Sequence, residues 1–139
     1  MPGKQIQELE QRRDELRSRM AAIRDMRQGS LVERYRRCGK QACHCAHEGA
    51  LGHGPSWSLT RAVGGKTVTR IIPSDAVERT REQMAEFHKF RELTRELVEI
   101  NERLCDARLR TDAELSDDRA KKRASRRSSR AKSPPRSRR

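Results

Sequence analysis

Hydrophobic side chains recur at helical spacing near the start of the chain. They follow steps of three and four residues, and Arg13 is the one exception to the pattern. The apolar positions are Ile6, Leu9, Leu16, Met20 and Ile23. The pattern ends before Gly29, and glycine often follows the last turn of a helix. We therefore predict an amphipathic helix over residues 5–27, within an N-terminal segment 1–29.

The middle of the chain alternates between hydrophobic and polar residues, which indicates β-strands. Residues 30–36 (SLVERYR) are rich in β-formers and predict one short strand. The stretch SWSLTRAVGGKTVTRIIP places two alternating runs around Gly64-Gly65, which predicts a hairpin with a two-residue turn. Pairing across this turn collects apolar residues on one face, which we expect the helices to cover. These residues are Trp57, Leu59, Val63, Val68 and Ile72.

A second and longer helix is predicted from about Ala76 to about Arg110, within a segment 74–110. Pro73 ends the hairpin, and Ser74 or Asp75 can cap the helix. Its apolar positions have the 3-4 spacing of a coiled coil and are Phe90, Leu93, Leu97, Ile100, Leu104 and Ala107. The side assigned to solvent carries Glu78, Glu82, Glu86, Arg91, Arg95 and Glu99. Because this helix is longer than the first, part of its apolar seam is expected to bind a second copy or another protein.

Hydrophobic patterning stops at Thr111. The following segment is rich in arginine, serine and lysine, contains Pro134-Pro135 and has few large apolar residues. Such a composition buries too little surface to offset the entropy of ordering, so residues 111–139 are predicted to be a disordered basic tail. The chain is thus expected to be an α+β protein, in which a zinc-loop and β-hairpin element over residues 30–73 lies between two helices.

Charge is distributed unevenly along the 139 residues, whose formal net charge is +13. Residues 119–139 contain 11 basic and no acidic residues, and residues 30–72 contain seven basic and two acidic ones. Residues 73–118 are acidic, with 13 acidic and eight basic residues. Basic surfaces bind nucleic-acid phosphates, and DNA is the expected partner rather than RNA. The predicted contact residues are Arg34, Arg36, Arg37, Lys40, Arg61, Lys66, Arg70, Lys121, Lys122, Arg123, Arg126 and Arg127.

Membrane and secretory segments are not expected. No apolar run approaches the roughly 18 residues that suggest a membrane span, and the N-terminus lacks the apolar centre of a signal peptide. We therefore expect a cytoplasmic protein with no membrane partner. In a reducing compartment, clustered cysteines are typical of metal ligands rather than of disulfides.

The cysteines Cys38, Cys43 and Cys45 gather in one short loop with the spacing C-x4-C-x-C. Zinc takes four ligands in a tetrahedron, and small structural sites often use three cysteines and one histidine. His53 is the favoured fourth ligand because the glycine-rich segment around it can fold back, and His47 is the alternative. A structural zinc ion would also compensate for the thin core, since aromatic residues make up 3% of the chain.

Catalysis is not expected from this sequence. A cysteine beside a histidine can be a nucleophile, but metal ligation would occupy the thiolates. The chain shows no glycine-rich phosphate loop, no paired carboxylates in an apolar setting and no acidic triad for Mg²⁺. We therefore predict a protein that is not an enzyme and has no small-molecule substrate.

The motif RCGKQACHC, followed by HGPSW and the GGK hairpin, resembles an uncharacterised family of small bacterial and archaeal proteins classed as a domain of unknown function. The resemblance covers residues 27–104. It implies a zinc site at Cys38, Cys43, Cys45 and His53. Some members are associated with transposases and mobile elements, which implies a nucleic-acid context.

Two functions are consistent with these features. The first is a zinc-stabilised nucleic-acid-binding or transposition-accessory protein, in which Tyr35 and Trp57 belong to the core rather than stack on bases. The alternative is a coiled-coil interaction adaptor with a structural zinc ion and a nonspecific cationic tail. The adaptor would bind its partner through Phe90, Leu97 and Leu104 of the long helix.

Overall fold

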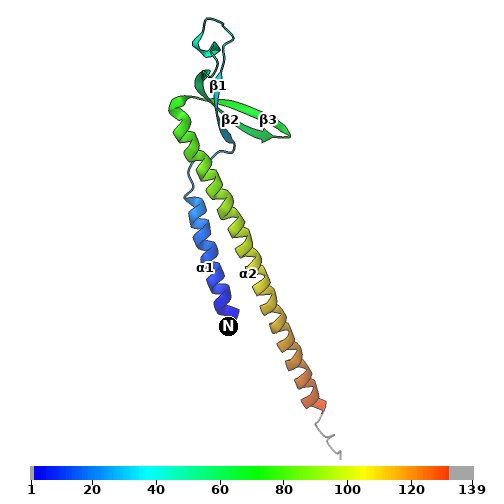
Figure 1. Ribbon diagram of the computed structural model, residues 1–139. Helices are drawn as coiled ribbons and strands as arrows, with labels where there is room; N and C mark the ends of the chain where they lie inside the picture. The colour runs from blue at the N-terminus through cyan, green and yellow to red at the C-terminus, as the bar shows by residue number, and fades with distance from the viewer. Residues whose placement is uncertain (1, 132–139) are drawn as a thin grey trace, which may run out of the picture. The chain divides into compact units, whose positions relative to one another are not determined.

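The computed structural model describes residues 2–131 and has the predicted α+β composition. Helix α1 spans Pro2–Ala21, and the strands are β1 (Ser30–Arg36), β2 (His53–Val63) and β3 (Lys66–Ile72). A short 3-10 helix η1 (His44–Ala46) lies between β1 and β2, and η2 (Ser74–Ala76) leads into α2 (Val77–Ala131). Figure 1 shows this order along the chain. Residues 19–94 form one compact unit, while residues 2–18 and 95–131 form another.

The three strands form one antiparallel sheet in the order β1-β2-β3. The predicted hairpin is confirmed, because Val63 pairs with Lys66 across Gly64-Gly65 and Trp57 pairs with Ile72 at the other end. Both turn glycines have positive φ, as a two-residue hairpin turn requires. The hairpin therefore has the register that the alternating pattern predicts.

The core of the 19–94 unit lies at the base of the hairpin. Leu59, Ile72 and Val77 are buried together, and the partly buried side chains packed against them are Leu31, Trp57, Ala76 and Met84. The expected cover over the whole face is wrong for the outer half of the hairpin. There Val63 and Val68 are 45% and 46% exposed. The first turns of α2 cover only the sheet positions near Leu59, so the hairpin tip is left in solvent.

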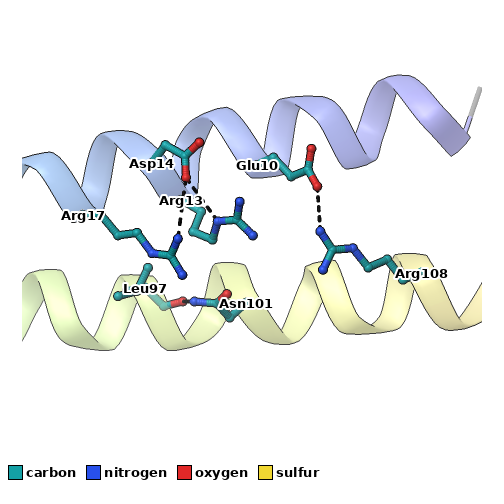
Figure 2. A network of polar contacts seen from close by, with 7 residues as sticks. All are labelled: Glu10, Arg13, Asp14, Arg17, Leu97, Asn101 and Arg108. Carbon is teal, nitrogen blue, oxygen red and sulfur yellow. Dashed lines mark hydrogen bonds and ion pairs between the residues drawn. The ribbon is translucent and has the colours of Figure 1, made fainter.

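The second unit contains most of α1 and the later part of α2, which lie side by side as shown in Figure 2. Its buried side chains are Leu9, Leu16, Ile100, Leu104 and Ala107. Ion pairs flank them: Arg108 donates to Glu10 at 2.6 Å, and Arg12 pairs with Glu96. Burial of the seam residues on α2 agrees with their predicted spacing.

Helix α1 ends six residues before the predicted end at Arg27. Two backbone amides beyond it bond to α2 instead of to carbonyls of their own helix. The Arg24 amide donates to the Glu86 carboxylate at 3.0 Å, and the Arg27 amide donates to the Gln83 carbonyl at 3.2 Å. These bonds hold the connector between α1 and β1, residues 22–29, against α2. They explain why Glu86, predicted on the solvated side, is only 7% exposed.

Helix α2 continues 21 residues beyond its predicted end at Arg110, so the predicted disorder is wrong for residues 111–131. The side chains from Asp112 to Ala131 are all exposed. No glycine or proline occurs between Thr111 and Pro134, and alanine, arginine, lysine and glutamate favour helix without any packing partner. The rest of the predicted tail, residues 132–139, lies outside the described residues. Within residues 2–131, no helix is long and apolar enough to span a membrane.

Candidate metal centre

The cysteine loop connects two strands that pair with each other. Strand β1 ends at Arg36, and β2 begins at His53, which lies opposite Arg36 in the register. Gly52 closes the loop against β1, because a Cβ atom there would lie 2.5 Å from the Arg36 carbonyl. Only glycine permits this approach. The sheet thus brings both ends of the loop to one place, with His53 as the first residue of β2.

Short turns inside the loop position the three cysteines. The Cys43 amide donates to the Lys40 carbonyl at 3.2 Å, and the Ala46 amide donates to the Cys43 carbonyl at 3.0 Å. Cys43 thereby caps η1, which carries Cys45. This local winding turns a C-x-C pair so that both sulfur atoms face the same point.

The four side chains predicted as ligands lie together. The Sγ atoms of Cys38, Cys43 and Cys45 and a ring nitrogen of His53 are all within 4.8 Å of one another. Cys38 Sγ lies 3.4 Å from Cys45 Sγ, and Cys43 Sγ lies 3.1 Å from His53 Nε2. This group can hold a metal ion. His47, the alternative fourth ligand, and His44 are not members of it.

The geometry of this Cys3His group fits tetrahedral zinc. With Zn–S near 2.3 Å and Zn–N near 2.0–2.1 Å, tetrahedral ligand atoms lie about 3.5–3.8 Å apart. The two short ligand contacts are slightly below this spacing, and none of the six pairs exceeds 4.8 Å. No disulfide competes for these sulfur atoms within the described residues. Four protein ligands would close the site, as in structural rather than catalytic zinc centres.

The innermost ligand also has a supporting hydrogen bond. Cys45 is fully buried, whereas Cys38 and His53 are exposed. The Cys38 backbone amide donates to Cys45 Sγ at 3.4 Å. An amide donor of this kind helps to hold the sulfur atom in a fixed orientation. The loop therefore has one buried sulfur around which the other ligands converge.

The predicted nucleic-acid contacts occupy three regions. Arg34 and Arg36 lie on β1, and Arg37 and Lys40 lie in the cysteine loop of residues 37–52, called the metal loop from here on. Arg61, Lys66 and Arg70 lie on the hairpin, and the residues from Lys121 to Arg127 lie on the last part of α2. All of them are exposed.

The register divides the basic residues of the sheet between its two faces. Arg34 pairs with Ser56, which is on the face opposite Leu59. Arg61 pairs with Val68 and Arg70 pairs with Leu59, so both belong to the Leu59 face. The alternation of side chains along paired strands therefore places Arg34 on one face of the sheet and Arg61 and Arg70 on the other.

The two aromatic residues of the sheet have different environments. Trp57 packs on the core as predicted, and the Arg81 guanidinium lies 5.1 Å from the centre of its ring. Tyr35 is 42% exposed, so its predicted place in the core is wrong. Its hydroxyl donates to Glu33 at 2.9 Å, and this bond to a carboxylate raises the pKa of Tyr35. Strand β1 therefore presents an exposed ring at the position between Arg34 and Arg36 in the sequence.

Comparison with known proteins identifies a family but no characterised relative. Residues 6–82 match the family described as Domain of unknown function (DUF6788), and the chain belongs to that family. The match includes the metal loop and the whole sheet and ends within the first two turns of α2. Searches among curated proteins and among solved structures found no significant match.

Proposed function

We propose that this protein is a non-catalytic nucleic-acid-binding protein whose basic loop is held in place by a structural zinc ion. The observation that carries the proposal is the convergence of Cys38, Cys43, Cys45 and His53 in the loop that also bears Arg37 and Lys40. Zinc bound there would order a segment that has almost no core of its own, since Cys45 is its one buried residue. DNA is the proposed partner.

The basic residues of the sheet and metal loop differ from those of the helices in having no carboxylate partner within the described residues, which supports a binding role for them. On the helices, arginines pair with carboxylates, as Arg108 does with Glu10 and Arg81 with Glu78. Within residues 2–131, no ion pair involves the seven basic residues of the sheet and metal loop. Unpaired guanidinium and ammonium groups are free to bind phosphates. The exposed Tyr35 ring lies between two of them in the sequence and can stack on a base.

The proposed role in transposition rests on the family resemblance alone. Binding through phosphate contacts carries little sequence information, so we expect weak sequence preference and strong salt dependence. An accessory protein of this kind would hold or shield DNA while another protein performs the chemistry.

The test compares two full-length variants that lose the same charge. R36Q/R37Q/K40Q removes three positive charges beside the metal cluster, and K121Q/K122Q/R123Q removes three from the end of α2. Binding to duplex and single-stranded DNA and RNA is measured by fluorescence anisotropy at several salt concentrations. We expect the loop variant to lose more affinity, with a salt slope smaller by about 2–3. Loss of binding only in the α2 variant would refute the proposal and leave a nonspecific polycation.

A second candidate, a protein-interaction adaptor, is favoured by one observation on α2. A shallow cavity of about 480 Å³ is lined by apolar and polar side chains, including Leu97, Val98 and Cys105. Val98 is 52% exposed, and Leu109 further along is 69% exposed. Leu104, one of the three residues first expected to bind the partner, is 1% exposed and cannot contact one.

The adaptor is tested by the oligomeric state of the protein. We propose that a second copy covers the Val98 side of α2. Light scattering on the wild type and on V98E/L109E measures the molar mass directly. A dimer that dissociates in the variant supports the adaptor, and a wild-type monomer at high concentration excludes self-association through α2.

A further inference from the structure

A cavity lined by positively charged side chains and by no acidic ones lies at the junction of the connector, β2 and α2, within the 19–94 unit. Its volume is about 300 Å³, at the lower end of the roughly 300–1,000 Å³ typical of small-ligand sites. Its lining includes three arginines, a histidine and a phenylalanine, and no acidic residue. The residues that matter here are Arg27, Thr60, Arg61, Phe87, His88 and Arg91.

The strand register explains why Arg61 reaches this cavity. Arg61 follows the buried Leu59 by two residues and therefore lies on the same face of β2, toward α2. On α2, Met84, Phe87, His88 and Arg91 follow steps of three, one and three residues, so they share one side of the helix. The two elements thus present their side chains to a common space just beyond the small core.

The connector closes the third side. The Arg27 amide donates to the Gln83 carbonyl, which fixes this segment against α2. Gly29 follows with φ of 140° and lies so close to β2 that a Cβ atom would be 2.8 Å from Leu59 Cδ1. A side chain at this position would push the connector away from β2. The connector side of the cavity is therefore fixed at two points, by the hydrogen bond to α2 and by the close approach of Gly29 to β2.

The three arginines have no carboxylate partner within the described part of the chain. The Arg91 guanidinium lies 5.9 Å from the centre of the Phe87 ring, in the range of a cation–π contact. A neighbouring cavity of about 370 Å³ differs in this respect, because Asp25, Glu82 and Glu86 line it together with two arginines. The cavity at Arg27, Arg61 and Arg91 therefore has positive charge that no carboxylate in its lining compensates, unlike its neighbour.

We propose that this cavity binds a phosphate group of a nucleic-acid strand, with Arg27, Arg61 and Arg91 as donors and Phe87 as the apolar wall for the attached sugar. Guanidinium groups match phosphate oxygens with two parallel hydrogen bonds, which lysine cannot do. The inference rests on the proposed function, and it adds a specific anchoring site away from the metal loop. The phosphate is either an internal diester or a terminal 5′-phosphate.

The experiment uses the full-length, zinc-loaded protein and single-stranded DNA labelled at its 3′ end. Matched oligonucleotides carry either a 5′-phosphate or a 5′-hydroxyl group. R61Q/R91Q removes two cavity donors. R103Q/R110Q is the control, because it removes two exposed arginines from α2 outside this cavity. R61K/R91K keeps the charge but loses the paired hydrogen bonds, and circular dichroism melting verifies that each variant folds.

We expect R61Q/R91Q to weaken binding about tenfold or more, and to lower the salt slope by about 1–2. The control should change little, and R61K/R91K should keep most of the salt slope while losing affinity. If R61Q/R91Q loses more affinity for the 5′-phosphorylated strand than for the 5′-hydroxyl strand, the cavity binds the terminal phosphate. If it loses equal affinity for both strands, the cavity binds an internal diester.

Other results overturn the inference in distinguishable ways. If R61Q/R91Q and R103Q/R110Q weaken binding equally, net charge explains both and the cavity is not a site. If R61Q/R91Q binds like wild type while R36Q/R37Q/K40Q does not, the cavity inference fails and the proposed function stands. If the wild-type protein binds none of the single strands, the cavity inference fails, and the duplex measurement described above decides the proposed function.

Discussion

Removal of the metal should unfold the cysteine loop while leaving the helices almost intact. The two α-helices contain 20 and 55 residues, whereas the metal loop contributes only the three residues of η1. Chelation or the substitution Cys45→Ala should therefore reduce the helical circular dichroism signal by only a few per cent. Cys105→Ala is the matched control, because Cys105 is exposed on α2 outside the ligand group.

The stabilisation by zinc can be estimated from linkage. Free zinc at 100 times its dissociation constant stabilises the folded state by about 2.7 kcal/mol. The sheet unit spans residues 19–94. For a unit of this size, each kcal/mol shifts the melting temperature by about 4–8 °C. The sheet unit should therefore melt about 10–20 °C lower when the zinc is removed.

Trp57 makes the assay specific for the sheet. It is the one tryptophan of the chain, lies four residues after His53 on β2 and packs on the core of the sheet unit. Its fluorescence is followed during thermal unfolding at buffered zinc concentrations, with metal content measured on the same samples. Hydrogen exchange of the loop amides should rise in parallel.

One result would refute the reasoning. If purified protein contains no metal and a strong chelator leaves the Trp57 melting temperature unchanged, the four side chains do not form a metal site. The same conclusion follows if Cys45→Ala and Cys105→Ala melt alike with zinc present.

Two further predictions concern the packing of α2. Leu16→Ala removes a fully buried side chain and should lower the free energy of unfolding, measured by urea titration, by about 2–5 kcal/mol. Leu109→Ala is the control, because Leu109 is 69% exposed and its loss should change the free energy little. Equal effects of the two substitutions would contradict the packing. The hydrogen bond from the Arg24 amide, and then the one from Lys89, lower the pKa of Glu86. The ionised carboxylate therefore stabilises the fold at pH values above the ordinary glutamate pKa. This stabilisation is lost as the pH falls through the lowered pKa of Glu86 in the folded protein. Glu86→Gln should therefore destabilise the protein at pH 7 and lose that effect toward pH 3, while the exposed Glu78→Gln should not; a pH-independent difference would exclude the carboxylate as its cause.

Local patterns in the sequence predicted the sheet and the convergence of the Cys and His side chains well. Strand β1 has the predicted bounds, and the Gly64-Gly65 turn set the hairpin register. The ligand group could be predicted because three cysteines lie within eight residues and the glycine-rich segment around His53 can fold back toward them. Both features depend on residues that are close in sequence.

Features that depend on contacts between distant segments were not predicted. The end of α1 is determined by hydrogen bonds from the connector to Gln83 and Glu86, and no periodicity reveals those bonds. Arg91 appeared to be an ordinary solvated residue, and its place in a cavity with Arg27 emerges only when the connector packs on α2. The charge-rich end of α2 was predicted to be disordered because it can bury little surface, whereas its alanine, arginine, lysine and glutamate residues favour helix without burial.

The most direct test of the account is DNA binding by the full-length protein with and without zinc, compared with R36Q/R37Q/K40Q under the same two conditions. If zinc holds the basic loop in its binding form, chelation should weaken the wild type to the affinity of the variant and should not weaken the variant further. Equal wild-type affinity with and without zinc, in protein shown to lose its metal, would contradict the central claim that the metal centre supports nucleic-acid binding.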